Sequence, residues 1–387
     1  MPDLTAFDRA VGADRLGRVA ELLERSGIPL EEVARVDKVR VGEHEVAIKV
    51  RQEDGSDRIE VVRQAADSLV LTPVWQSGPA WPVVAAAAPV RVAASRARPA
   101  DDCITAVVLP DTQIGWWDLD EGLVPMHDPA ALTVAVELVR RARPHHVVIL
   151  GDLLDLGEAS TKWLTTPTFA RTTQASLDAA HEWLAQVRAA APAAEISLIE
   201  GNHDRRLSTL IQSNAASAFG LRRAQMPADW PVLSLPNLLR LDELDIRWYA
   251  GYPAARVWLR EDVLVHHGTK VSAHKASRDP VAVSTIQGHT HRLGAQTRTL
   301  LGPGYPIHTV HVECGTLARV DGAVPSVHGS VDDSGRPLPA HEDWQQGLVV
   351  LEMDPEPGDL PTVELVPIHQ GRARWRGRTF SASGGTE

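Results

Sequence analysis

The sequence predicts an α/β protein in which two sheets pack face to face and helices lie outside them. In the first part of the main region, short apolar strands alternate with amphipathic helices, as in a sheet that is buried on both faces. In the second part, strands follow one another with few helices between them. At 387 residues the chain is longer than most single cores, so we expect about two domains.

Residues 1–76 predict a small α+β N-terminal domain. Residues 15–26 carry apolar side chains at helical spacing, and Gly27 follows as a stop signal. Residues 39–50 alternate between apolar and polar in the manner of a strand, and residues 58–62 and 69–74 predict further strands. Residues 77–100 are rich in Ala and Pro and have no clear period, which predicts a linker or an irregular crossover.

Residues 101–370 form the predicted main domain. Its first part predicts strands at 103–109, 147–150 and 196–199 and helices at 129–141 and 168–189. Its second part predicts strands at 246–249, 263–266, 281–287, 307–312, 347–351 and 362–366. Residues 371–387 are basic and then rich in Ser and Gly, which predicts a mobile tail.

Composition and charge narrow the class of protein. With 44% hydrophobic and 23% charged residues, the chain is typical of soluble globular proteins. The small-apolar stretch at residues 83–92 is far shorter than the roughly 20 residues that a membrane span requires. The N-terminus lacks the basic and apolar regions of a secretory signal, so we expect a cytoplasmic protein without membrane contact. A net charge of −11 disfavours a general nucleic-acid binder but leaves a local basic groove open.

Five short segments carry the residues that point to chemistry, and each ends an apolar run and opens a loop. In order they are Asp111-Thr-Gln113, Gly151-Asp152-Leu-Leu-Asp155, Gly201-Asn202-His203-Asp204, His266-His267-Gly268 and Gly288-His289-Thr-His291. A single Asp or Asn after a strand is usually a turn former or a helix cap. The recurrence of the arrangement at several strand ends, where ligands of α/β sheets collect, predicts instead a site for two metal ions.

Strand geometry restricts which histidines can reach such a site. Alternation along an extended segment puts His289 and His291 on the same side, so both can face one pocket. His266 and His267 are adjacent and should point to opposite faces, so only one of them can reach the metals.

The ordered set of segments resembles the motifs of the calcineurin-like metallophosphoesterases, which run Asp-x-His, Gly-Asp-x-x-Asp, Gly-Asn-His-Asp/Glu, His before Gly, and Gly-His-x-His. The resemblance covers roughly residues 103–314 and is closest to bacterial and phage-type members, with a distant similarity to double-strand-break-repair nucleases. It implies a four-layer α/β/β/α sandwich. It also implies hydrolysis of a phosphate mono- or diester by a hydroxide that bridges two divalent metal ions.

The resemblance assigns the ligands residue by residue. The first metal would take Asp111, Asp152 and His291, and the second would take the bridging Asp152 with Asn202, His267 and His289. In the same comparison, His203 is the candidate acid, while Asp155 and Asp204 orient it or a ligand. His267, the histidine next to Gly268, is chosen over His266 because the family places its ligand before Gly.

Gln113 departs from the family pattern, which has a ligand histidine at this position. If its carbonyl oxygen coordinates the first metal, an oxygen-preferring ion such as manganese is expected, with iron, zinc and nickel as alternatives. Otherwise that metal is held more loosely, or one site is lost.

Arg205 and Arg206 follow the third segment directly and, with Asn202, are candidates for binding the substrate phosphate, because a guanidinium matches phosphate oxygens two at a time. The expected partner is a phosphate ester, and nucleic acid remains open. The alternatives to a general phosphoesterase are a DNA exo- or endonuclease of the repair type and a binding or regulatory module with a degenerate metal site.

Overall fold

The computed structural model describes residues 23–24, 33–40, 43–51, 57–65, 68–73, 103–119, 122–160, 169–270, 281–321 and 342–382. The chain divides into two compact units, Met1–Ala85 and Ala86–Glu387. The predicted linker at 77–100 and most of the predicted helix at 15–26 lie outside the described residues, and residues 23–24 are helical. In the part of the chain that the structure describes, no helix is both long and apolar enough to span a membrane.

The N-terminal unit contains two antiparallel strand pairs. Strand β1 (Val33–Arg40) pairs with β4 (Ser68–Pro73), and β2 (Glu43–Arg51) pairs with β3 (Asp57–Ala65). The segment predicted as one strand at 39–50 therefore contains parts of two strands with different partners, because its alternation continues from the end of β1 into β2.

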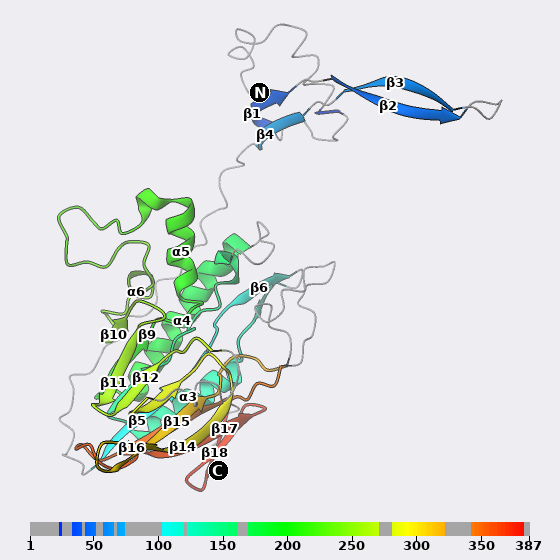
Figure 1. Ribbon diagram of the computed structural model, residues 1–387. Coiled ribbons are helices and arrows are strands. Elements are labelled where there is room, and N and C mark those ends of the chain that lie inside the picture. Colours follow the sequence, from blue (N-terminus) through cyan, green and yellow to red (C-terminus); the bar gives the residue numbers. More distant parts are fainter. Residues whose placement is uncertain are drawn as a thin grey trace. The chain divides into compact units, whose positions relative to one another are not determined.

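The large unit is a mixed α/β structure whose main sheet has eight strands in the order β10-β9-β8-β5-β16-β17-β18-β19 (Figure 1). Four of these strands are parallel neighbours: β5 (Ile104–Leu109), β8 (His146–Ile149), β9 (Glu195–Ile199) and β10 (Ile246–Tyr249). The other four run antiparallel to their neighbours: β16 (Gly347–Met353), β17 (Thr362–His369), β18 (Arg372–Trp375) and β19 (Arg378–Ser381).

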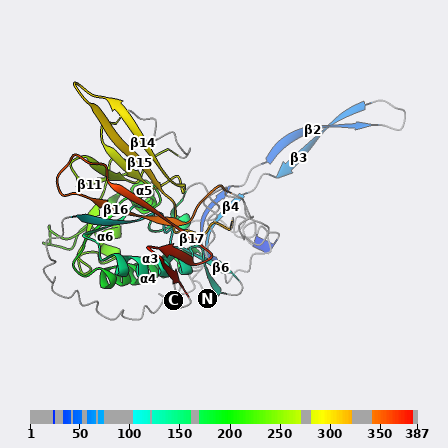
Figure 2. The same cartoon turned by 90° about the horizontal axis from the view of Figure 1, so that it is seen from below.

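A second sheet has five strands in the order β11-β12-β13-β15-β14. They are β11 (Arg256–Arg260), β12 (Val263–His266), β13 (Ser284–Gln287), β14 (Leu293–Leu301) and β15 (Pro306–Cys314). The central strands β12, β13 and β15 are parallel, and β14 and β15 form a long antiparallel hairpin, drawn in yellow in Figure 2. A separate two-stranded hairpin joins β6 (Trp116–Leu119) and β7 (Gly122–Pro125).

Two apolar clusters hold these layers together. One cluster joins the two sheets, with Val108 and Val148 from the large sheet and Val265, Ile286 and Val312 from the small one. Strand residues of the large sheet alternate between this cluster and the other one, as the period of two requires. The second cluster covers the opposite face of the large sheet with helices α3 (Pro129–Ala142) and α4 (Phe169–Ala190). The central strands β5, β8, β9 and β16 of the large sheet are therefore buried on both faces.

Shorter helical segments lie in the connections between the parallel strands of the large sheet. They are η2 (Gly157–Ala159), α5 (Arg205–Asn214), η3 (Ala216–Ala218) and α6 (Leu235–Leu238). Helix α5 begins directly after the segment Gly201-Asn202-His203-Asp204, so its N-terminus lies at the edge of the large sheet where the parallel strands end.

The prediction of a mobile tail at 371–387 is wrong for the part that the structure describes. Residues 371–382 carry β18 and β19, which extend the large sheet. Their side chains Trp375 and Phe380 are buried. The arginines that made the segment look like a solvated tail alternate with the buried residues Ala373 and Trp375. Residues 383–387 lie outside the described range.

Candidate metal centre

All five polar segments open at the carboxyl ends of parallel strands. In the large sheet, Asp111, Asp152 and Asn202 follow the adjacent strands β5, β8 and β9. In the small sheet, His267 and His289 follow the adjacent strands β12 and β13. Because the sheets share a core, these two edges meet, and hydrogen bonds from the His289 amide to the Asp111 carboxylate, at 3.1 and 3.2 Å, join the loops.

Asp152, His267 and His289 form a cluster in which one ligand atom from each residue lies within 4.8 Å of the others. The predicted ligand Asn202 joins them, since its Oδ1 lies 3.0 Å from His267 Nε2. His267 Nε2 is also 3.3 Å from Asp152 Oδ2. The four residues assigned to the second metal are therefore gathered at one place.

The second ring nitrogen of His267 explains its orientation. Nδ1 lies 2.8 Å from the Leu150 carbonyl oxygen, and donation to that carbonyl leaves Nε2 as the nitrogen that faces the cluster. His267 is buried, whereas His266 is the last residue of β12 and only half-buried. Of the two neighbouring histidines, the structure thus brings the predicted one to Asp152.

The residues assigned to the first metal lie beside this cluster. His291 Nε2 is 3.1 Å from Asp111 Oδ1, and both residues are buried. Among the described residues, Gln113 Oε1 and His291 Nδ1 are buried without a hydrogen-bond partner. Buried polar atoms need a partner. The Gln113 carbonyl oxygen offers a lone pair. His291 Nδ1 offers one as well when the Nε2–H of the same ring donates to Asp111. A cation can bind to both lone pairs.

The backbone at the predicted ligands is strained. Asp111, Gln113, Asp152, His289 and His291 all have a positive φ, between 41° and 65°. This left-handed conformation is uncommon for residues other than Gly, and it concentrates at functional sites. The neighbouring glycines allow close approach: a Cβ on Gly151, where φ is +90°, would come within 2.7 Å of His267 Nδ1, and one on Gly201 would collide with Asp152.

The electrostatics of the cluster favour a cation. The carboxylates of Asp111, Asp152, Asp155 and Asp204 are each at most 2% exposed. Burial acts to raise the pKa of Asp152, but His203 and His267 lower it more, and its pKa lies below the ordinary value. Burial acts to lower the pKa of His267, and Asp152 raises it to about 10. A proton on His267 therefore neutralises part of the buried negative charge, a role that a divalent cation can take over.

The pKa of His289 shifts in the opposite direction to that of His267. Burial, followed by the charge on His267, lowers the pKa of His289 to about 4. A neutral imidazole is the form that binds metal ions. The donor set of carboxylate, amide and imidazole groups fits divalent metals of the manganese, iron and zinc type.

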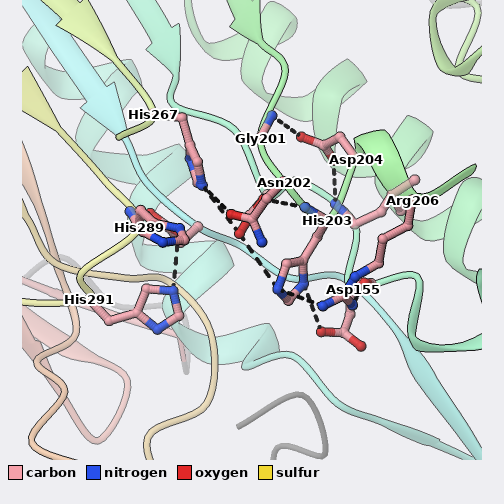
Figure 3. A network of polar contacts seen from close by, with 12 residues as sticks. Asp155, Gly201, Asn202, His203, Asp204, Arg206, His267, His289 and His291 are labelled. Carbon is pink, nitrogen blue, oxygen red and sulfur yellow. Dashed lines mark hydrogen bonds and ion pairs between the residues drawn. The ribbon is translucent and has the colours of Figure 1, made fainter. Parts of the chain in front are cut away.

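His203 lies across from His267, His289 and His291, together with Asp155 and Arg206 (Figure 3). Its Nδ1 is 3.2 Å from Asp155 Oδ1, and its Nε2 is 3.0 Å from Arg206 Nη2 and 3.8 Å from Asp152 Oδ2. The backbone amide of His203 donates to Asp152 Oδ1 at 2.8 Å. His203 is therefore held between a buried carboxylate and a guanidinium, next to Asp152 of the cluster.

The two acidic residues predicted to orient the site have different positions. Asp155 contacts His203 directly, whereas Asp204 accepts hydrogen bonds from the backbone amides of Leu154 and Gly201. Asp204 thus ties the loop after β8 to the loop after β9. Burial, and then the charge of Asp152, raise the pKa of Asp204 to about 7.

The structure also separates Arg205 from Arg206. Arg206 donates to the Asp155 carbonyl at 2.6 Å and contacts His203, so its guanidinium is used within the protein. The Arg205 side chain is 42% exposed and lies 3.9 Å from Glu200 Oε2. Of the pair, Arg205 is the one whose side chain is available to a ligand.

Three residues near the site have no role in the sequence-based assignment. The Trp344 ring packs edge-on against His291 at 4.1 Å, and the Tyr252 ring packs against His267 at 5.8 Å. Glu200 accepts hydrogen bonds from the amides of Gly251 and Tyr252 and so holds the loop that carries Tyr252. Each contact joins segments far apart in the chain, and no local pattern signals it.

Comparison with known proteins adds no assignment: no family model matches the sequence, and no curated protein matches it.

Proposed function

We propose that this chain is a metal-dependent phosphoesterase of the calcineurin-like type that hydrolyses a phosphate mono- or diester. The observation that carries the proposal is the convergence of the predicted ligands from five loops on one buried edge, with Asp152 at its centre. The helices α3 and α4 on the large sheet and the small sheet on its other face support a four-layer α/β/β/α arrangement. A helical layer outside the small sheet is part of this proposal.

The residues divide into two ligand sets that share one carboxylate. Asp111, Gln113 and His291 would hold one cation, while Asn202, His267 and His289 would hold the other, and Asp152 would contact both. When bound, two such cations supply an activated water and offset the charge that develops on phosphorus. The first set is rich in oxygen donors, which favours manganese.

The chain's own residues then position the ester. His203 faces the cluster from the opposite side, where its Nε2 can reach an ester oxygen. Arg206 donates to that same nitrogen, so proton donation from Nε2 requires Arg206 to release it first. Asp155 keeps the ring oriented through Nδ1. Arg205 and Asn202 lie on the same loop and helix start and would contact phosphate oxygens.

Metal content and turnover test the proposal together. Purified protein loaded with manganese is expected to retain about two ions per chain and to hydrolyse p-nitrophenyl phosphate or its bis ester. The variant His267→Ala should lose metal and activity, because His267 joins Asp152 and Asn202. His308→Ala is the matched control, since His308 is exposed on β15.

A substrate panel separates the related functions. It contains nucleotides, other phosphomonoesters, single-stranded DNA and duplex DNA. Cleavage restricted to DNA would assign a nuclease. A protein that binds no metal and cleaves none of these substrates would contradict the proposal and leave a binding or regulatory module.

A further inference from the structure

An apolar cavity of about 400 Å³ lies along helix α5, beside the candidate metal centre. One wall is formed by Leu207 and Ile211, which lie one turn apart on α5. Aromatic side chains from three segments complete the lining: Phe219, Trp230 and Trp248. A cavity of this size lined by aromatic rings is typical of a site for a small, flat organic group.

The segment that covers the cavity exposes several large apolar side chains. Phe219 is 49% exposed and Trp230 is 41% exposed, and Leu221, Met226, Val232 and Leu233 are also exposed. None of the residues of α5 is buried, although the helix has apolar residues on the cavity side. Phe219, Trp230 and Leu233 line the same cavity, and exposed apolar side chains gathered in this way are typical of a place where a ligand or partner binds.

The cavity and the metal centre share a wall. Asp204 and Arg205 line the cavity, and they directly follow Asn202 and His203 in the chain. Glu200, another lining residue, accepts from the Tyr252 amide at 3.0 Å, and the Tyr252 ring packs against His267. A phosphate at the metal centre would therefore lie within reach of Arg205, with its organic group directed along α5.

We propose that this cavity binds the flat aromatic group of the substrate, so that the enzyme acts on phosphate esters of the nucleoside class. The inference rests on the proposed function and names its substrate class. The charge pattern agrees with such a ligand, because Arg205 lies at the end near the metal centre while the rings of Trp230 and Trp248 provide a stacking surface. A sugar phosphate would leave this apolar surface uncovered.

Two diesters with the same leaving group test the proposal: the p-nitrophenyl ester of thymidine 5′-monophosphate and methyl p-nitrophenyl phosphate. Stacking of a base contributes about 1–3 kcal/mol, so kcat/KM should favour the thymidine ester by about fivefold or more. Ile211→Trp fills the cavity and Trp230→Ala removes a stacking surface. Each should lower this ratio to less than about threefold. Thr209→Trp, on the exposed side of α5, is the matched control and should keep the ratio.

A wild-type ratio near one, or equal ratios in all three variants, would overturn the proposal. Loss of a concentration-dependent dimer in Trp230→Ala, with an unchanged ratio, would also overturn it by placing a second copy of the chain on this surface. If wild-type protein cleaves neither diester, its turnover of the monoester p-nitrophenyl phosphate shows whether the proposed function also fails. Calorimetric binding of thymidine 5′-monophosphate then decides the cavity separately. Weaker binding by Ile211→Trp than by Thr209→Trp would support the cavity, and equal binding would reject it.

Discussion

Replacing Asp155 with asparagine tests whether His203 acts through its carboxylate partner. Asp155 is fully buried, and its Oδ1 lies 3.2 Å from His203 Nδ1. This contact is an ion pair, and hydrogen-bond energies set its scale: about 1.5–3 kcal/mol when a charged group takes part and about 1 kcal/mol when both groups are neutral. Asparagine keeps the shape but removes the charge, so the loss is roughly 1–2 kcal/mol. If the contact acts fully in the transition state, kcat falls roughly 5- to 30-fold.

The assay is turnover of bis(p-nitrophenyl) phosphate with added manganese, together with metal analysis of each variant. His203→Ala should retain its metal and lose a factor on the order of 10² or more in kcat. If Asp155 acts only through His203, the double variant should be no slower than His203→Ala alone. Asp242→Asn, an exposed aspartate on the same domain, is the control. Multiplicative losses in the double variant, or loss of metal from Asp155→Asn, would refute the reasoning.

Three further changes probe the loops and the core. Gly201→Ala should abolish metal binding, because the added Cβ would collide with Asp152. Gly294→Ala is the control and should keep its metal, because its Cβ would meet no atom within 4 Å. Metal analysis compares the two variants. Burial raises the pKa of Glu158, so the folded state favours the protonated carboxyl group. The stability that this preference contributes is present below 4.5, the pKa of the unfolded state, and is lost as the pH rises. Glu158→Gln should therefore raise the melting temperature more at pH 8 than at pH 4. Arg188 is buried and donates to the carbonyls of Ala194, Leu244 and Asp245, which belong to two segments. Arg188→Ala should therefore lower the free energy of unfolding by about 2–4 kcal/mol in urea titrations.

Strand positions in the large unit follow closely from the apolar runs, since a buried parallel strand must be apolar on both faces. The predicted strand at 246–249 coincides with β10, and that at 263–266 with β12. Exposed strands were harder to predict. The sequence does not predict β14 because none of its residues is buried and its centre, residues 296–299, is polar, so its position depends on pairing with β15. The sequence does not predict β18 and β19 either, because Arg372, Arg374 and Arg378 are typical of a solvated tail.

In the candidate site, too, the sequence predicts some features and tertiary contacts decide the others. Strand alternation shows that only one of His266 and His267 can face the metals, but it does not show which one. The choice depends on the Leu150 carbonyl, which lies in another sheet and orients His267. Arg205 and Arg206 are equivalent in sequence, and only the start of α5 directs one towards His203 and the other towards the cavity.

By itself the sequence determined which residues follow each strand and in what order, and therefore the kind of donor atoms available. Local patterns carry this information because strands and loops have their own periods and turn residues. The tertiary structure alone decided the meeting of Asp111 with His291, 180 residues apart, the left-handed backbone at the predicted ligands and the aromatic cavity beside α5. These features arise from packing between elements that lie far apart in the chain, and such packing depends on contacts that no short segment contains.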